Sequence, residues 1–195
     1  MFQLTPVVKN LVIINVLFFF GSLLIFGDGR GREILALSPP GQGFKPYQLV
    51  THMFMHANFQ HILFNMFGLV IFGTAVEQIF GPKRFLGFYL ACGFGALALH
   101  LISPLWTGYA SGAWGASGAV MGVSVAYAVI YPHRKLMLLF PPIPVKAWIL
   151  VSFFVLLDLY SGFGTSDSGI AHFAHIGGAI VGFVLTYFWK RKGFR

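Results

Sequence analysis

The feature that most limits how this chain can fold is a series of long apolar runs that recur from one end to the other. Hydrophobic residues make up 57% of its 195 residues, whereas charged residues make up only 9%. A chain of this composition cannot expose most of its side chains to water. Because no polar block is long enough to fold as a separate soluble domain, we expect a single integral membrane domain over residues 1–195.

Glycines and prolines divide the apolar runs into six expected helices. Their approximate ranges are 8–26, 59–80, 85–103, 117–131, 146–161 and 171–190. The predicted fold class is an all-α membrane protein, a six-transmembrane-helix bundle with a membrane-associated first loop and a short central helix. That central helix, 117–131, extends roughly 22 Å, whereas the apolar core of a bilayer is about 30 Å thick. Its N-terminus is therefore expected within the membrane, enclosed by protein and facing a wet cavity.

The basic residues indicate how the helices are oriented. With the N-terminus inside the cell, 10 of the 13 lysines and arginines lie on the cytoplasmic side, and the other three, Arg30, Arg32 and Lys45, lie in the first loop. The sequence therefore predicts cytoplasmic N- and C-termini. The starts of 117–131 and 171–190 then face the outer side. Because the charge of +8 is explained by topology, no nucleic-acid partner is expected.

Polar side chains within the apolar runs are costly, so they mark candidate functional positions. His61 and Asn65 are four residues apart and share one helical face. Taken alone, this pair is more simply interpreted as an interhelical hydrogen bond. Glu77, near the inner end of the same helix, is expected to have a structural role.

The stretch WGASGAVMG places Ser117 at the start of the central helix, where a serine either caps the helix or acts as a nucleophile. In AHFAHIGGAIVGF, Gly178 and Gly182 lie on the same face as His175. WGASGAVMG has its own two glycines four residues apart, and paired small residues allow two helices to approach closely. The two patterns predict a contact that brings His175 beside Ser117.

This pairing suggests acyl-transfer chemistry. A neutral imidazole can take the proton of a serine hydroxyl. The backbone N–H of Ser117 and the side chains of His61 and Asn65 are candidates for stabilising an oxyanion. No carboxylate, Asp158 and Asp167 included, belongs to a motif beside the histidine, so a dyad is favoured. The sequence GASGA does not match the G-x-S-x-G elbow of soluble hydrolases.

Three motifs in order, HANFQHILFN, WGASGAVMG and AHFAHIGG, resemble those of rhomboid intramembrane serine proteases from about Thr51 to Gly182. The chain looks like a minimal prokaryotic-type member. The resemblance implies roles for a small set of residues: a nucleophile Ser117, a general base His175, and the oxyanion-site or supporting residues His61, Asn65 and Gly115. It also implies structural roles for His52, His56 and Glu77.

Two positions depart from the family pattern. Many relatives carry Trp-Arg in the first loop, where this chain has Tyr47-Gln48, which leaves the anchoring of that loop open. Met121 stands one turn after the serine, where an aromatic ring often packs on the catalytic imidazole. A methionine sulfur can still contact an aromatic ring favourably, so activity is expected to survive.

The resemblance implies transmembrane-helix substrates, no cofactor or metal, and a place in the lipid bilayer, such as a bacterial inner membrane. The loops TGYASGAWGA and SGFGTSDSG, the second including Ser168, are expected to form a mobile cover over the site. Weaker alternatives are a zinc protease built on His52, His56 and His61, an aspartyl protease, a transporter, and a proteolytically inactive protein that binds membrane helices. The oligomeric state is left open.

Overall fold

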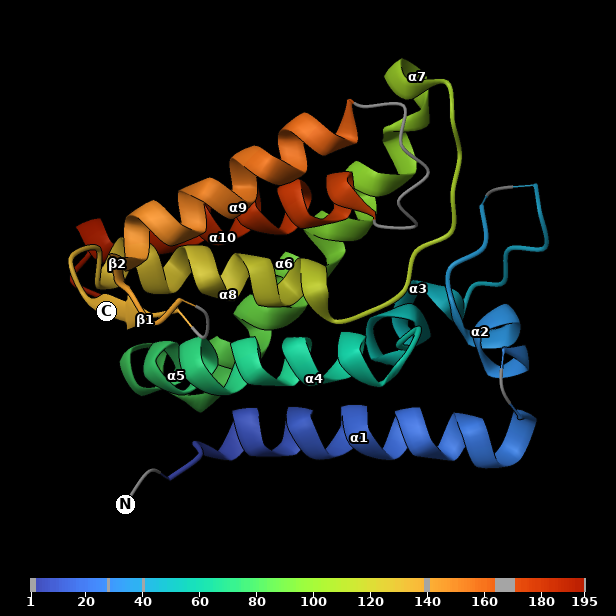
Figure 1. Cartoon of the computed structure of the whole chain (residues 1–195), viewed down its shortest axis with the longest axis horizontal. Coiled ribbons are helices and arrows are strands. Elements are labelled where there is room, and N and C mark those ends of the chain that lie inside the picture. The colour runs from blue at the N-terminus through green and yellow to red at the C-terminus, as the bar shows by residue number, and fades with distance from the viewer. Residues whose placement is uncertain (1–2, 28, 40, 139–140, 164–170, 195) are drawn as a thin grey trace.

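A computed structural model describes residues 3–27, 29–39, 41–138, 141–163 and 171–194 (Figure 1). The chain is mostly helical, and helices occupy the six predicted positions to within about three residues. Their bounds are α1 Pro6–Phe26, α4 Phe59–Gly68 with the π-helix η2 Leu69–Gly73 and α5 Thr74–Phe80, α6 Pro82–Ile102 followed by α7 Pro104–Thr107, α8 Ser117–Ile130, α9 Ala147–Gly162 and α10 His172–Arg191.

Among the described residues, four helical stretches are long and apolar enough to cross a membrane. They are Pro6–Phe26, Phe59–Phe80, Pro82–Thr107 and His172–Arg191, whereas α8 and α9 are apolar but shorter. The chain is therefore an integral membrane protein. Six separate crossings remain a prediction, because α8 and α9 fall below the length that a straight crossing needs.

The connecting segments contain more regular structure than the sequence predicted. The first loop, expected to lack a spanning helix, forms three short helices, α2 Arg30–Leu35, α3 Gln48–Thr51 and η1 His52–Phe54. The fourth loop forms an antiparallel hairpin of β1 Lys135–Met137 and β2 Pro144–Lys146. The all-α prediction is wrong in this detail. Prolines stop the helix here, and pairing the two short strands satisfies backbone groups that would otherwise lack partners.

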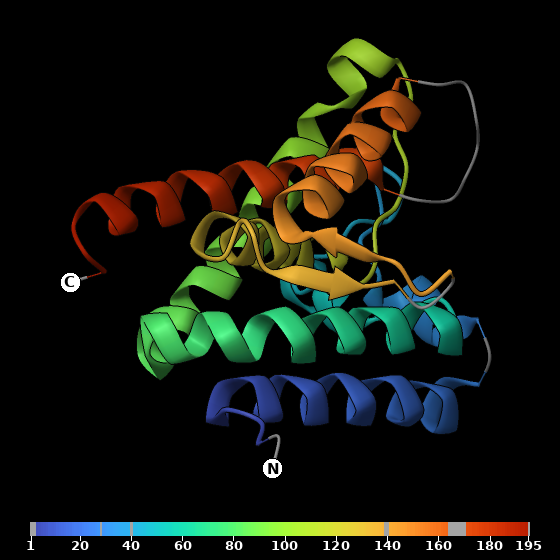
Figure 2. The ribbon, with the colours of Figure 1, turned by 60° about the vertical axis from the view of Figure 1, so that its left-hand side comes forward.

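The short helix α8 lies at the centre of the molecule. Figures 1 and 2 show it between a layer containing α1, α4 and α5 and a layer containing α9 and α10. Nine of its 14 residues are buried, and most of these are glycine, alanine or serine. Because neighbouring helices enclose it, α8 can begin within the bundle without exposing its first backbone N–H groups to lipid.

Glycines bring the backbones of α8 and α10 together. A Cβ atom added to Gly182 would lie 2.6 Å from the Cα atom of Gly122, and a Cβ atom on Gly178 would overlap the carbonyl oxygen of Gly118. Only glycine fits at such a close approach. This is the helix contact that the spacing of small residues predicted, and it places His175, one turn before Gly178, at the level of Ser117.

We expect Gly178→Ala to destabilise the protein by roughly 1–3 kcal/mol, because the new methyl group must push α10 away from the carbonyl of Gly118. The same change at Gly87 in α6 is the matched control, since a Cβ atom there meets no neighbour within 4 Å. Thermal unfolding in detergent measures both. Equal unfolding temperatures for the two variants would contradict this account of the contact.

Candidate active site

Ser117 is the first residue of α8 and Ala116 is the N-cap, so of the two roles open to this serine the structure does not support that of a helix cap. The residue before them, Gly115, has a φ of +113°, and its N–H donates to the carbonyl of His52 at 2.8 Å. A Cβ atom on Gly115 would lie 2.9 Å from Cε1 and Nε2 of His61. The backbone angle and the nearby ring both require glycine at this position.

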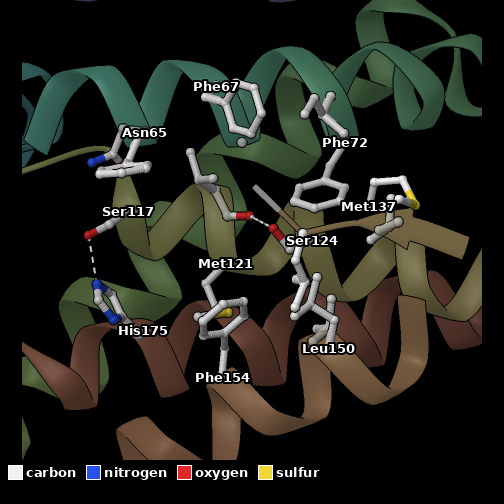
Figure 3. A pocket seen from close by; sticks show the side chains of 17 residues that line it. Asn65, Phe67, Phe72, Ser117, Met121, Ser124, Met137, Leu150, Phe154 and His175 are labelled. Carbon is white, nitrogen blue, oxygen red and sulfur yellow. Dashed lines mark hydrogen bonds between the residues drawn. The ribbon is translucent and has the colours of Figure 1, made fainter. Parts of the chain in front are cut away.

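The side chains of Ser117 and His175 meet directly. The distance from the serine Oγ to the histidine Nε2 is 2.8 Å, a hydrogen bond that joins the start of α8 to the first turn of α10 (Figure 3). In a neutral imidazole with its proton on Nδ1, Nε2 accepts the serine hydroxyl proton. A serine and a base at this separation form the arrangement that nucleophilic catalysis requires.

A carboxylate lies on the other side of His175, which the sequence analysis missed. Nδ1 of His175 is 3.0 Å from both Oδ1 and Oδ2 of Asp158 in α9, and Nδ1 of His172 is 2.7 Å from Oδ1. Asp158 precedes His175 by 17 residues on another helix and belongs to no motif. The sequence did contain one indication of this contact. Placing an aspartate in an apolar membrane helix costs free energy unless another side chain of the bundle binds it.

His61 and Asn65 lie on α4, across from the serine. The side-chain oxygen of Asn58 caps this helix by accepting from the N–H of His61 at 2.8 Å, and Asn65 Nδ2 donates to the carbonyl of His61 at 2.8 Å. The N–H of Ala57 faces Nδ1 of His61 at 3.4 Å, which favours the tautomer with its proton on Nε2. The Nε2 proton of His61 and the second amide hydrogen of Asn65 take no part in the hydrogen bonds just described.

Ser117, His175 and Asn65 line one end of a cavity of about 600 Å³ that reaches Met137 of the hairpin at its other end (Figure 3). Its walls are mainly apolar and come from α4, η2, α8, α9 and the hairpin. Other lining residues include Phe64, Phe67, Phe72, Met121, Leu150 and Phe154. A cavity of this size, with mainly apolar walls, fits an extended apolar peptide segment better than a small polar molecule.

Gln48, at one of the two positions where many relatives carry Trp-Arg, binds several groups of the first loop. It is 1% exposed, and its Oε1 accepts from the N–H groups of Ser38 and Lys45, while its Nε2 donates to the carbonyl of Ile34 and to Ser38 Oγ. Tyr47 beside it is exposed. One buried amide thus holds several backbone groups of the first loop together.

The first loop is in turn joined to the third loop, which leads to the serine. Leu37 and Ala113 exchange two backbone hydrogen bonds, of 2.9 and 3.1 Å, and Arg32 lies over the ring of Trp114 at 5.7 Å. Two loops were expected to cover the site, the third and the fifth loop of the chain. The third loop is thus held by direct contacts with the first. The described part of the fifth loop ends at residue 163, and its residues 164–170, with Ser168, lie outside the described residues.

Glu77 lies away from this cavity, at the N-terminus of α1. Its two carboxylate oxygens accept from the backbone N–H groups of Val7 and Val8 at 3.0 and 2.9 Å. These N–H groups belong to the first turn of α1 and have no acceptor within that helix. The contact gives Glu77 a structural role in joining α1 to α5.

His52 and His56, in the first loop, contact residues beside Ser117: the carbonyl of His52 accepts from Gly115 N–H, and His56 packs on His61. Nδ1 of His52 binds the carbonyl of Gln48 at 2.8 Å, and the ring of His56 packs edge-on to His61 at 5.2 Å. Burial lowers the pKa of His52, and it lowers the pKa of His56 to about 4, with His61 adding to the shift. Within the described part of the chain, no group of three or more histidine, cysteine or acidic side chains could hold a metal ion.

The fold and the site define a membrane protein that holds a serine and a histidine together inside a helical bundle. The family model of the Rhomboid domain matches residues 43–192, so the chain belongs to the rhomboid family, as the three sequence motifs indicated.

Individual relatives agree with this assignment. The chain is 35% identical over 139 residues to the rhomboid protease GluP of Bacillus subtilis (strain 168), covering 70% of this chain and 25% of GluP. It is 34% identical over 161 residues to RHOMBOID-like protein 12, mitochondrial, of Arabidopsis thaliana, covering 75% and 47%. It is also 30% identical over 204 residues to the rhomboid protease AarA of Providencia stuartii, covering 91% and 70%. The chain thus spans less than half the length of the first two relatives.

The neutral state of His56 makes stability depend on pH. Its folded pKa of about 4 lies below the ordinary value of 6.5, so the unfolded chain binds a proton first. The contribution of His56 to the free energy of unfolding is therefore fully present above about pH 6.5. It is lost as the pH drops toward 4, by as much as about 3 kcal/mol. His56→Asn is expected to flatten this dependence, measured as unfolding temperature against pH in detergent. His133→Asn, the same substitution at an exposed histidine, is the matched control.

Proposed function

We propose that this chain is an intramembrane serine endopeptidase that cleaves transmembrane-helix substrates near the outer face of the membrane. The observation that carries the proposal is the 2.8 Å hydrogen bond between Ser117 Oγ and His175 Nε2 at one end of an apolar cavity within the bundle. Membership of the rhomboid family and similarity to GluP and AarA, both named proteases, support it.

The reaction follows from this geometry. As Ser117 Oγ attacks the carbonyl carbon of the scissile peptide bond, its proton passes to Nε2 of His175. When the tetrahedral intermediate collapses, His175 returns that proton to the leaving amine and Ser117 keeps the acyl group. A water molecule, deprotonated by the same nitrogen, then attacks the ester carbonyl and releases the new carboxylate and the free serine.

The oxyanion that forms in each step has three candidate donors. The N–H of Ser117 belongs to the first turn of α8, where backbone N–H groups have no acceptor within the helix. Asn65 has a second amide hydrogen, and His61 presents its Nε2 side toward Gly115, beside the serine. Donors fixed in place before the reaction stabilise the developing charge without reorganisation.

The shape of the cavity favours a substrate that leaves the lipid in an extended form. A helix hides its carbonyl groups in hydrogen bonds four residues apart, so a scissile carbonyl reaches Ser117 only after local unwinding. Ser117, His175 and Asn65 lie at one end of the cavity and mainly apolar side chains line the rest, which suits a carbonyl at the serine and apolar side chains beyond it. Small or helix-weakening residues near the cleavage site would lower the cost of unwinding.

The proposed orientation has both termini in the cytoplasm and the active site toward the outer side, as in a bacterial inner membrane. Basic residues gather at the ends of helices remote from the site, Lys83 and Arg84 at the start of α6 and Lys190 and Arg191 at the end of α10. Ser117 and His175 lie at the opposite ends of their helices from such charges. The positive-inside rule then places the catalytic pair near the outer surface.

Purified protein is expected to cleave a reporter that contains a transmembrane segment, and Ser117→Ala and His175→Ala should each abolish that cleavage. Ser22→Ala is the matched control, since Ser22 is a buried serine on α1 that bonds its own helix at Phe19. Undiminished cleavage by both catalytic variants would contradict the proposal. Absence of cleavage and of fluorophosphonate labelling in the wild type would favour an inactive helix-binding relative, and loss of activity with a chelator would favour a metalloprotease.

Asn65→Ala should lower kcat by roughly 10²-fold and change KM little, because the amide acts on charge that develops only in the transition state. Cleavage kinetics of the same reporter measure both constants. A loss confined to KM would indicate that Asn65 binds the substrate in its ground state. In that case the oxyanion role should be withdrawn.

A further inference from the structure

Asp158 is an unusual residue for its place in the fold. Of the 16 residues of α9, only Ala147, Val151 and Asp158 are buried, and the first two lie within the first five residues of the helix. The buried residue of the second half of α9 is therefore a carboxylate. Burying a carboxylate in an apolar bundle is costly unless hydrogen-bond donors surround it.

Two histidines of α10 supply these donors. Nδ1 of His172 is 2.7 Å from Oδ1, and Nδ1 of His175 is 3.0 Å from both oxygens of the carboxylate. An ionised carboxylate only accepts hydrogen bonds, so each ring presents an N–H at Nδ1. For neutral His175 this fixes the tautomer, and its Nε2 lone pair then faces Ser117 Oγ at 2.8 Å.

We propose that Asp158 is the positioning residue of the active site, which makes the working unit a Ser117–His175–Asp158 triad rather than a dyad. The inference rests on the proposed function and adds a residue to it. Asp158 holds the imidazole of His175 in the tautomer that accepts the serine proton. Its negative charge also stabilises the imidazolium that forms when that proton is transferred.

The alternative is that Asp158 only fastens α9 to α10. A second contact joins the C-terminus of α9 to the N-terminus of α10, because the ring centroids of Phe163 and Phe173 lie 5.4 Å apart. A Cβ atom on Gly162 would also lie 3.2 Å from the ring of Phe173. The helices therefore remain in contact when the carboxylate is changed, and Asp158→Asn, which keeps the shape of the side chain, is expected to fold.

The two possibilities differ in what Asp158→Asn does to Ser117. An asparagine amide offers N–H donors where the carboxylate offered only acceptors, so His175 can move its proton to Nε2. That tautomer cannot accept the serine proton. The same substitution in a soluble serine protease triad lowers kcat by about 10⁴-fold for this reason.

His172 provides an internal control, since it binds the same carboxylate one helical turn before His175. His172→Leu removes that hydrogen bond, while the contact of His175 with Oδ2 of Asp158, at 3.0 Å, does not depend on it. A purely structural fastening predicts similar effects for Asp158→Asn and His172→Leu. A positioning role predicts that Asp158→Asn is far more harmful to the reactivity of Ser117.

The experiment compares wild type, Ser117→Ala, Asp158→Asn and His172→Leu as purified full-length proteins. Three quantities are measured: the rate of Ser117 labelling by a fluorophosphonate, kcat and KM on the transmembrane reporter, and the unfolding temperature. Asp158→Asn should lower the labelling rate and kcat by at least about tenfold, with KM and the unfolding temperature little changed. His172→Leu should keep most of the labelling rate.

The triad is overturned if Asp158→Asn is labelled and cleaves at the wild-type rate, or if both variants lose activity in step with their unfolding temperatures. Should Asp158→Asn not fold, Asp158→Glu and Asp158→Gln form a second isosteric pair, and equal labelling of that pair also overturns it. A wild type that neither cleaves nor reacts at Ser117 contradicts the proposed function itself, and the triad with it. Cleavage that depends on Ser117 but not on Asp158 contradicts the triad alone.

Discussion

The close approach of α8 and α10 is the constraint on which the rest of the structure depends. Gly178 and Gly182 face Gly118 and Gly122 so closely that a Cβ atom at either α10 position would meet the backbone of α8. This contact sets the relative height of the two helices, and the hydrogen bond from Ser117 to His175 follows from it. The other helices then enclose the pair, which keeps the first turn of α8 away from lipid.

Polar groups in this bundle are placed where another group can satisfy them. Glu77 caps α1, Gln48 holds the first loop, and Asp158 receives two histidine N–H groups. Each of these contacts replaces water in an apolar surrounding. Polar contacts of this kind hold helices and loops together in a membrane, where the hydrophobic driving force that packs soluble proteins is missing.

Much of the fold and of the site was open to prediction, since both depend on local patterns. Apolar runs and helix breakers located all six main helices, and glycine spacing paired Ser117 with His175. The hairpin at Lys135–Lys146 and the role of Gln48 were not predicted, because strand pairing and buried amide contacts join residues without a shared motif. Asp158 was not assigned to the site for the same reason, although the free-energy cost of an aspartate in an apolar helix indicated that it needs a partner.

The sequence by itself determined the class of protein, the positions of its helices and the identity of the serine and histidine. These follow from composition, periodicity and the spacing of small residues, which act within one helix or between two faces. Only the tertiary structure decided that Ala116 rather than Ser117 caps α8, and that a carboxylate from α9 meets His175. Those outcomes depend on how three helices pack together, and no single stretch of chain encodes the distances between them.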